Sequence, residues 1–262
     1  MRDLAKMLEA VKEISVEAGR VIMEVYNDPL LFNVEYKADE SPITLADKSS
    51  NEIICNRLKE LTPDIPIISE ENKEIPFQER KGYRYAWIVD PVDGTKEFIN
   101  RNGDFTVNIA LLHQGRPVLG VVYVPVTNEL YWGIDGQGAF KSTDNGKAIS
   151  LKAKSYRPNQ KGLKIVCSRS HLNDATQAFI DGYDTPEKVS RGSSLKFLLL
   201  AEGEAHIYPR MAPTMEWDTA AADIILAEAG GRVLDGDTQK PLQYNKENLL
   251  NPYFVAYADL QE

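Results

Sequence analysis

The spacing of apolar residues changes twice along this chain, and this change constrains the fold more than any other feature. Over residues 3–26 apolar side chains recur every three or four positions, which predicts one long amphipathic helix. Between about residues 65 and 132 the pattern changes to short apolar runs separated by turn residues, which predicts strands. After about residue 155 predicted strands alternate with predicted helices. Such a chain folds into packed layers of helix and sheet.

A second helix is predicted to begin near Thr44, because Thr44 and Asp47 resemble a capping box. The strands predicted in the first part are Ile65–Ser69, Arg84–Asp90, Thr106–Leu112, Val118–Val124 and Glu129–Trp132. The elements predicted in the second part are strands at Leu163–Cys167, Lys188–Arg191, Ala205–Tyr208 and Arg232–Leu234, and helices at 173–181, Ser193–Glu202 and Thr219–Ala229. We place a boundary within Ser155–Gln160, so that residues 1–155 and 156–262 form two halves of one compact unit.

Charge and cysteine usage exclude several classes of protein. The 39 acidic side chains outnumber the 30 basic ones and give a formal net charge of −9, which is unfavourable for general binding to nucleic acid or to an anionic membrane. No apolar run approaches the ~20 residues of a membrane-spanning helix, and charged residues directly after Met1 are unlike a signal peptide. Cys55 and Cys167 have no spacing pattern, which predicts reduced thiols and a cytoplasmic location.

The most informative segment for chemistry is Asp90-Pro91-Val92-Asp93-Gly94-Thr95. An apolar strand ends at Asp90, Pro91 turns the chain, and Asp93 follows three residues later. Two carboxylates aimed at one point repel each other unless cations lie between them. Thr95 adds a hydroxyl, and a helix beginning there would offer backbone N–H groups to a phosphate. The alternative is a surface turn, because Asp, Pro and Gly are common turn residues.

Two further acidic residues favour the cation interpretation. Glu70 follows a short apolar strand, and Asp218 directly precedes an Ala-rich helix. Alone, Glu70 would be a solvated strand end and Asp218 would be a helix N-cap. Together with Asp90 and Asp93 they form a set of oxygen ligands without a nearby Cys/His cluster. Such a set suits a hard cation, and Mg²⁺ fits best because it is held by few carboxylates together with a substrate phosphate.

These motifs resemble the inositol monophosphatase superfamily of Mg²⁺-dependent, lithium-sensitive phosphatases. The superfamily resemblance rests on Asp90–Thr95, on Glu70 upstream and on Trp217–Ala221 downstream. Within the superfamily the chain is similar to the bacterial CysQ branch of 3′(2′),5′-bisphosphate nucleotidases. The segments that carry this narrower resemblance are Asp39–Asp47, Asp93–Ile99, Arg101–Asn108, Ser168–His171, Gly192–Phe197 and Tyr208–Arg210. The resemblance spans about residues 35–255.

The resemblance implies a fold and a reaction. The expected fold is a layered α/β/α/β sandwich of the inositol monophosphatase and sugar phosphatase type, with the active site between its two halves. The expected reaction is hydrolysis of the 3′-phosphate of adenosine 3′,5′-bisphosphate to AMP and phosphate, with 3′-phosphoadenylyl sulfate as a further candidate substrate. An inositol monophosphatase or fructose-1,6-bisphosphatase is the alternative enzyme, and a non-catalytic, metal-dependent nucleotide sensor is the alternative from another class. Oligomeric state and peripheral association with the inner membrane stay open.

The resemblance also implies a role for individual residues. The ligands expected for a first Mg²⁺ are Glu70, Asp90 and the carbonyl of Val92. Those expected for a second Mg²⁺ are Asp90, Asp93 and Asp218. A third, weaker site is expected beside Glu70. Asp47 and Thr95 match the pair that orients and deprotonates the attacking water. The residues expected to contact substrate are Glu70, Val92, Asp93, Gly94, Thr95, His171, Ser193, Lys196, Arg210 and Asp218.

Four of these positions have ordinary alternatives that the sequence leaves open. Ser193 is also a candidate helix N-cap, and Lys196 is also a candidate exposed lysine in the first turn of that helix. His171 is one of only three histidines and could be structural. Arg210 could form a surface ion pair that contributes little.

Overall fold

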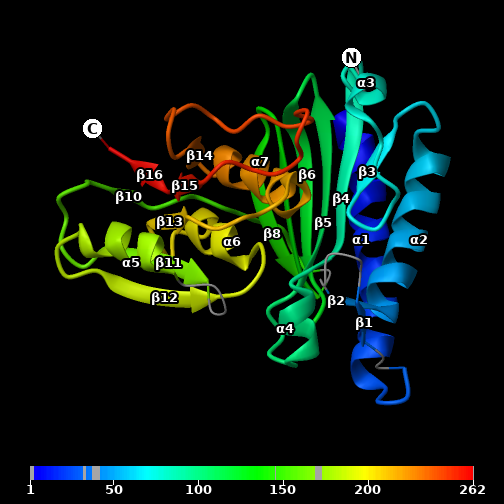
Figure 1. Cartoon of the computed structure of the whole chain (residues 1–262), viewed down its shortest axis with the longest axis horizontal. Helices are drawn as coiled ribbons and strands as arrows, with labels where there is room; N and C mark the ends of the chain where they lie inside the picture. Colours follow the sequence, from blue (N-terminus) through cyan, green and yellow to red (C-terminus); the bar gives the residue numbers. More distant parts are fainter. Residues whose placement is uncertain (1–2, 32–33, 37–41, 145, 169–172, 262) are drawn as a thin grey trace.

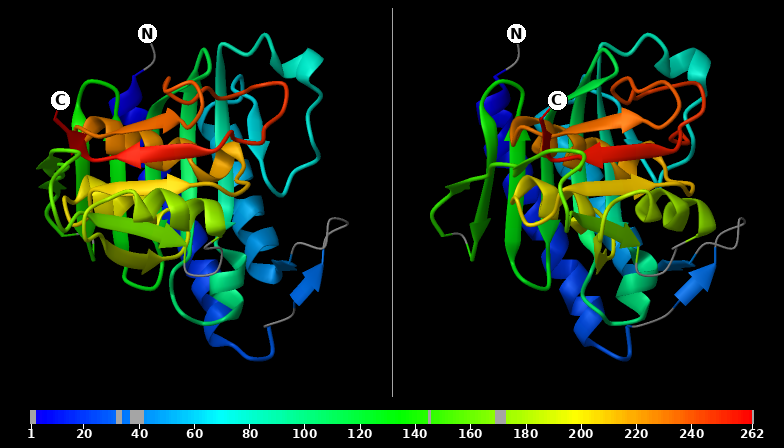
Figure 2. Two further views of the ribbon diagram at one scale, coloured as in Figure 1. Left: turned by 60° about the vertical axis from the view of Figure 1, so that its left-hand side comes forward. Right: turned by 90° about the vertical axis from the view of Figure 1, so that its left-hand side faces the viewer.

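The computed structural model describes residues 3–31, 34–36, 42–144, 146–168 and 173–261. Helices and sheets alternate in layers (Figure 1). Helices α1 (Leu4–Asn27) and α2 (Leu45–Leu61) cover one face of a seven-stranded sheet, and α7 (Ala220–Glu228) packs on its other face. Helix α6 (Leu195–Ala201) lies beside α7 and contacts a five-stranded sheet. The expected α/β/α/β layering is confirmed, and α5 (Asp174–Asp181) adds a helix on the outer face of the second sheet (Figures 1 and 2).

The larger sheet is antiparallel except for its first pair. Its strands, in spatial order, are β3 (Ile67–Ser69), β4 (Tyr85–Asp93), β5 (Thr106–His113), β6 (Arg116–Val124), β7 (Glu129–Ile134), β8 (Gly138–Thr143) and β9 (Ile149–Ser150). Only β3 and β4 run parallel among these pairs. The predicted strands of this region are therefore confirmed, although β8 and β9 were not predicted from the sequence.

The second sheet is mixed. Its strands, in spatial order, are β12 (Glu187–Arg191), β11 (Lys164–Ser168), β13 (Ile207–Arg210), β15 (Phe254–Tyr257) and β14 (Arg232–Asp235). Strand β11 is parallel to β12 and β13, whereas β15 is antiparallel to both of its neighbours. The smaller elements are β1 (Val34–Tyr36), β2 (Pro42–Thr44), α3 (Phe77–Arg80), α4 (Thr95–Ile99), β10 (Ser155–Tyr156), β16 (Asp259–Leu260) and the 3₁₀ turn η1 (Glu216–Asp218).

The central strands are apolar on both faces because both faces are covered. In β4, Trp87 and Val89 pack in the core beneath α1 and α2, whereas Ile88 packs in the core shared with the second sheet. The second core also takes residues from both halves of the chain, including Ala110 and Val255. This burial explains why the sequence reads as continuous apolar runs there. The division after residue 155 stays a prediction.

Close contact between α7 and the larger sheet depends on a glycine. A Cβ atom at Gly120 would lie 2.4 Å from the carbonyl oxygen of Ala221 in α7. Any side chain at this position of β6 would push the helix away from the sheet. Since η1 directly precedes α7, this close approach also sets the depth at which Asp218 enters the site.

Two predictions about the chain as a whole can be compared with this structure. Cys55 and Cys167 are both buried, free thiols, in agreement with the expected reduced state. Among the described residues, no helix has both the length and the apolar character to span a membrane.

Candidate active site

The predicted site residues gather around one cavity of about 240 Å³. Of the expected substrate and metal residues, the lining includes Glu70, Asp90, Val92, Asp93, Gly94, Thr95, Ser193, Lys196, Arg210 and Asp218. Asp47 does not line the cavity, but its carboxylate accepts a hydrogen bond from the lining residue Thr95. His171 lies outside the described residues. The cavity thus joins strand ends of the larger sheet to segments of the second half.

A β-bulge brings the two aspartates of the central motif to one side of the sheet. Strand β4 does not end at Asp90 but continues to Asp93, so the expected chain turn at Pro91 is an irregularity within the strand. Asp90 pairs with Asn108 and Asp93 with Thr106, which leaves one extra residue on the β4 side. In a regular strand residues three apart point to opposite faces. The extra residue restores a common face and points both carboxylates at the cavity.

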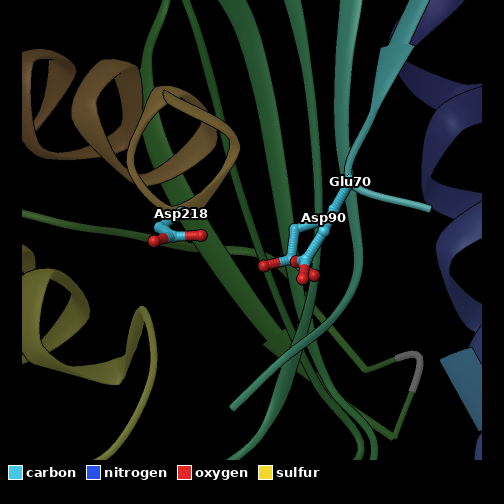
Figure 3. A group of neighbouring side chains, drawn as sticks. All are labelled: Glu70, Asp90 and Asp218. Carbon is cyan, nitrogen blue, oxygen red and sulfur yellow. The ribbon is translucent and has the colours of Figure 1, made fainter. Parts of the chain in front are cut away.

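Three carboxylates form a tight cluster at this point (Figure 3). One oxygen each from Glu70, Asp90 and Asp218 lies within 4.8 Å of the others. Figure 3 shows Glu70, directly after β3, side by side with Asp90 of β4, and Asp218 faces them from the second half. Burial, followed by repulsion from neighbouring carboxylates, raises the pKa of Asp90 and Asp218 well above the usual range. Asp93 lines the same cavity but lies outside this group of three.

The cluster fits a hard divalent cation. Its donors are carboxylate oxygens, and no His or Cys belongs to the group within the part of the chain that the structure describes. The raised pKa of Asp90 and Asp218 indicates negative charge that the surrounding protein does not neutralise. Oxygen donors with excess negative charge are what Mg²⁺ binds in proteins.

Asp218 is positioned by a polar network and not as the N-cap of α7. Asp218 is the last residue of η1, and its Oδ2 accepts a hydrogen bond from Met215 N at 2.9 Å. The N-cap of α7 is Thr219, which makes no side-chain capping bond. The N-cap alternative for Asp218 is therefore wrong.

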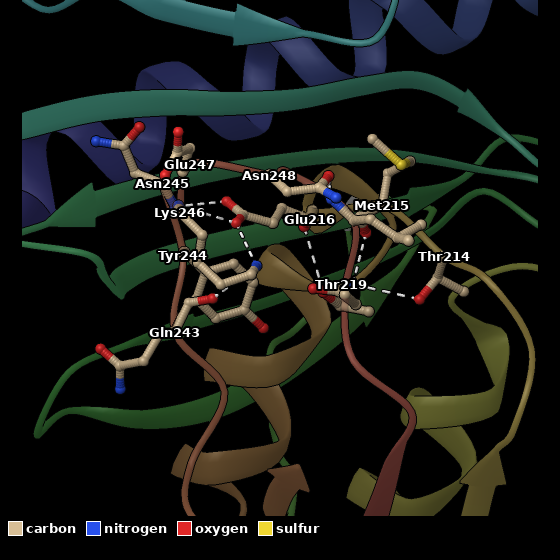
Figure 4. A network of polar contacts seen from close by, with 12 residues as sticks. Thr214, Met215, Glu216, Thr219, Gln243, Tyr244, Asn245, Lys246, Glu247 and Asn248 are labelled. Atoms are coloured by element: carbon tan, nitrogen blue, oxygen red, sulfur yellow. Dashed lines mark hydrogen bonds and ion pairs between the residues drawn. The ribbon is translucent and has the colours of Figure 1, made fainter. Parts of the chain in front are cut away.

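Two residues before Asp218, the fully buried Glu216 is the centre of that network (Figure 4). Its carboxylate accepts hydrogen bonds from the backbone N–H groups of Asn245 and Lys246, and it pairs with the Lys246 ammonium. The neighbouring Asn251 side chain donates to the Met215 carbonyl and to the Thr219 hydroxyl. The segment around residues 243–251 therefore fixes the turn that carries Asp218.

Asp47 and Thr95 form the expected pair. The Thr95 hydroxyl donates to Asp47 Oδ1 at 3.1 Å, and Asp47 Oδ2 accepts from Thr44 N at 2.7 Å. The capping box of α2 and the contact with Thr95 thus coexist, one on each oxygen. Burial raises the pKa of Asp47, against the hydrogen bonds that lower it. Helix α4 begins at Thr95, but it is only five residues long.

The turn before α6 differs from the predicted one. The helix begins at Leu195 and its N-cap is Ser194, so the N-cap alternative for Ser193 is wrong. Ser193 has a left-handed backbone with φ of 44°, and its hydroxyl lies 3.0 Å from that of Thr106. Gly192 packs tightly here, because a Cβ atom would lie 2.8 Å from the Asp104 Cβ. Residues 192–194 therefore sit directly against the first half.

Two cationic side chains also line the cavity. Lys196 is buried, which excludes the exposed-lysine alternative, and its ammonium donates to the Ser193 carbonyl and lies over the Tyr208 ring. Burial lowers the pKa of Lys196 to about 8. Arg210 Nη2 donates to the Pro213 carbonyl, whereas its buried Nε has no hydrogen-bond partner among the described residues. An anion that enters the cavity can supply that partner.

Several lining residues were not predicted from the sequence. Phe197, Tyr208 and Phe254 line the cavity and form an aromatic group with ring centroids 5.0–5.7 Å apart. Thr214 also lines the cavity and was missed, as were Ser194 and Glu216, which do not line it but belong to the hydrogen-bond networks around the site residues. Tyr208 could have been found, since it directly precedes the Pro209-Arg210 pair that the resemblance includes, but aromatic residues are more often core residues and carry no signal of their own.

Comparisons with known proteins agree over nearly the whole chain. The sequence profile of the inositol monophosphatase family matches residues 3–258. A protein of Escherichia coli O6:H1 named 3′(2′),5′-bisphosphate nucleotidase CysQ is 44% identical over 249 residues, which cover 95% of this chain and 98% of the relative. The homologue of that name in Haemophilus influenzae is 35% identical, with 97% of this chain and 93% of the relative covered.

Solved structures give the same relationship. The crystal structure of CysQ from Bacteroides thetaiotaomicron, a bacterial member of the inositol monophosphatase family, superposes with a TM-score of 0.86 at 42% identity and covers 98% of both chains. The IMPase of Thermotoga maritima shares the fold with a TM-score of 0.79 at 24% identity, covering 97% of this chain and 92% of that one. The profile match and the identity to full-length relatives establish that this chain belongs to the inositol monophosphatase family.

Proposed function

We propose that this protein is a Mg²⁺-dependent 3′(2′),5′-bisphosphate nucleotidase, which hydrolyses the 3′-phosphate of adenosine 3′,5′-bisphosphate to AMP and phosphate. 3′-Phosphoadenylyl sulfate is a second candidate substrate, which would place the enzyme in sulfur assimilation and nucleotide recycling in the cytoplasm. The observation that carries the proposal is one cavity lined both by a carboxylate cluster and by the cations Lys196 and Arg210. The relatives named as bisphosphate nucleotidases support it.

The carboxylates of the cavity would bind the scissile phosphate through divalent cations. Glu70, Asp90, the Val92 carbonyl, Asp93 and Asp218 would hold two Mg²⁺ ions, with a third beside Glu70. Bound there, the ions would neutralise the phosphate and the leaving oxygen. Without bound metal ions these carboxylates would repel a phosphate, so the reaction should depend strictly on the divalent ion. Lithium sensitivity is expected from family membership.

Asp47 and Thr95 are suited to activate water. The Thr95 hydroxyl already donates its proton to Asp47 Oδ1, so its oxygen is free to accept a proton from water as its own proton moves to the carboxylate. Burial raises the pKa of Asp47 and makes it a stronger proton acceptor than an exposed aspartate. The water oxygen then attacks phosphorus while the 3′-oxygen of the ribose departs.

The cations Lys196 and Arg210 would bind the second phosphate. Arg210 offers a planar set of donors, including the buried Nε, and Lys196 adds a point charge. The aromatic group of Phe197, Tyr208 and Phe254 provides apolar surface next to these cations. An inositol monophosphate carries no second phosphate and would give Lys196 and Arg210 no phosphate to bind. This difference favours the nucleotide over the inositol phosphate.

Phosphate release by the purified full chain tests the proposal. Adenosine 3′,5′-bisphosphate, inositol 1-phosphate and fructose 1,6-bisphosphate are compared at equal concentration, each with Mg²⁺ and with a chelator. We expect the highest kcat/KM with the nucleotide and no release with the chelator. Preference for either sugar phosphate would refute the substrate assignment. Tight nucleotide binding without hydrolysis would support the alternative of a nucleotide sensor.

A further inference from the structure

One oxygen of Asp93 receives an unusual number of hydrogen-bond donors. Asp93 Oδ2 accepts from the backbone N–H of Ser194 at 2.7 Å and from the Ser194 hydroxyl at 2.9 Å. Asn108 Nδ2 donates to the same oxygen at 3.2 Å, and the Thr106 hydroxyl lies 3.4 Å away. A carboxylate oxygen has about two lone-pair directions. The donors around Oδ2 occupy both and leave Oδ1 for a cation.

Ser194 connects the two halves at this point. It is only 1% exposed and lies just before α6, whereas Asp93 belongs to β4. The Ser194 hydroxyl oxygen lies 2.9 Å from Asp93 Oδ2 and 3.1 Å from the backbone carbonyl oxygen of Asp218, and it has one proton to donate between them. The hydroxyl oxygen also accepts from Asn108 Nδ2 at 2.9 Å. One small side chain therefore contacts both Asp93 and the main chain of Asp218.

A second carboxylate anchors the same turn. Asp104 Oδ2 accepts from Gly192 N at 2.9 Å, and the Arg191 guanidinium lies 3.3 Å from Asp104 Oδ1. Between the two anchored residues, Ser193 is held in a left-handed conformation that a non-glycine residue adopts only at an energetic cost. The anchors on both sides compensate for this strain. The turn thus depends on Asp93 and Asp104 for its shape.

We propose that Ser194 is a positioning residue that makes Asp93 a one-oxygen ligand of the divalent cation and couples cation binding to nucleotide binding. A cation on Oδ1 and the donors on Oδ2 together fix the Asp93 side chain, and Asp93 in turn fixes the turn that presents Ser193 and leads to Lys196. Each ligand then favours the other, because coupling between two binding sites is reciprocal. The cation part rests on the metal site of the proposed function, and the coupling part rests on its nucleotide.

Calorimetric titration of the metal-free full chain with Mg²⁺ tests the first part. Ser194→Ala should raise the dissociation constant for Mg²⁺ by roughly tenfold or more, the effect expected for a hydrogen bond to a charged group. Ser15→Ala is the matched control, since Ser15 is also buried and its hydroxyl donates only to the Val11 carbonyl within α1. Both variants should lower the Tm of the metal-free protein, but only Ser194→Ala should weaken Mg²⁺ binding. Unchanged Mg²⁺ affinity in Ser194→Ala would overturn the proposal.

Two further measurements keep the proposal testable if that variant folds poorly. In the wild-type protein, the amide NMR signal of Ser194 should shift with the same Mg²⁺ dependence as the calorimetric signal, and a stationary signal would refute the link. AMP, the product of the proposed reaction, should bind more tightly with Mg²⁺ than without it, and Ser194→Ala should reduce that ratio severalfold. An equal ratio in both proteins would refute the coupling. If AMP does not bind at all, the proposed function fails, whereas the Mg²⁺ titration still decides whether Ser194 positions Asp93.

Discussion

The two halves of the molecule hold their site residues by different means. In the first half Glu70 directly follows β3, and Asp90 and Asp93 belong to the adjacent β4, in a sheet buried on both faces. In the second half Asp218 lies on a single 3₁₀ turn, and Ser193 lies in a strained turn. Backbone ladders fix the main chain that carries the first group, whereas the turns that carry the second group are fixed by hydrogen bonds to side chains.

This difference separates tasks as well as structures. Backbone hydrogen bonds of the larger sheet do not depend on side-chain identity, so its strands should tolerate substitutions of residues that do not contact the ligands. The second half depends on a few buried polar groups, of which Glu216 is the most enclosed. Loss of one partner there leaves a buried group unsatisfied. We therefore expect substitutions of the first half to affect chemistry and those of the second half to affect geometry, specificity and stability.

The largest effect is expected for the proton relay of the first half. Thr95→Ala and Asp47→Asn should each lower kcat by about 10²–10⁴-fold with little change in KM, because they act on proton transfer. Asparagine at position 47 can still accept from Thr44 N, so the capping box and the Tm should be preserved. Steady-state kinetics of both single variants and the double variant provide the measurement. The double variant should lose little more than either single one, and additive losses would show that the two residues act separately.

In the second half, the largest effect on stability is expected at Lys246. Lys246→Met leaves the fully buried Glu216 carboxylate without its cation, and breaking such a pair should cost about 3 kcal/mol of unfolding free energy. Lys48→Met is the control, because the Lys48–Glu35 pair is about half exposed on both sides and should contribute at most about 1 kcal/mol. Urea denaturation followed by fluorescence measures both. Equal small losses would mean that the network around Asp218 adds no rigidity.

A smaller effect is expected for specificity. Arg210→Ala should reduce kcat/KM for adenosine 3′,5′-bisphosphate by on the order of tenfold, since one charge-assisted contact is lost. Hydrolysis of adenosine 3′-phosphate, which lacks the 5′-phosphate, should barely change. Parallel assays with the two substrates give the comparison. If both rates fell equally, Arg210 would act on the fold or on the scissile phosphate.

A pH-dependent effect on stability is expected at Asp223, which contacts the segment that holds Glu216. Burial raises the pKa of Asp223 to about 7, and its Oδ2 accepts a hydrogen bond from the Tyr244 hydroxyl. The unfolded chain therefore loses this proton at lower pH than the folded protein does, so the stability contributed by Asp223 falls between about pH 4 and pH 7. Asp223→Asn keeps an acceptor for Tyr244 and removes the titration.

The Tm of Asp223→Asn relative to wild type should accordingly be higher at pH 8 than at pH 4, by on the order of 10 °C, given about 1.4 kcal/mol per pH unit between pH 4 and pH 7 and about 2–4 °C per kcal/mol. Thermal scans at both pH values measure this difference. A Tm difference that does not change with pH would show that folding leaves the pKa of Asp223 unchanged. The hydrogen bond between Asp223 and Tyr244 would then contribute the same stability at both pH values.

Local patterns determined the parts of this protein that the sequence could predict. Helix α1, the capping box at Thr44 and strands β3 to β7 of the larger sheet follow from apolar spacing and from residues within a few positions of one another. Carboxylates at the ends of apolar strands, such as Glu70 and Asp90, already indicated an oxygen-ligand site. Strands β8, β9 and β15 were not predicted, and β9 has only two residues, which are too few to show a period.

The tertiary structure alone decided how these groups meet. The bulge that aligns Asp90 with Asp93 is visible only from the pairing of β4 with β5. The burial of Lys196 depends on Tyr208, which β13 places beside the start of α6, so a lysine in the first turn of a helix gave no sign of it. The four donors around Asp93 Oδ2 come from residues 13 to 101 positions away. Apolar spacing encodes which face of an element is buried, but the partner of each buried polar atom is set by packing between distant segments, and that packing exists only in the folded chain.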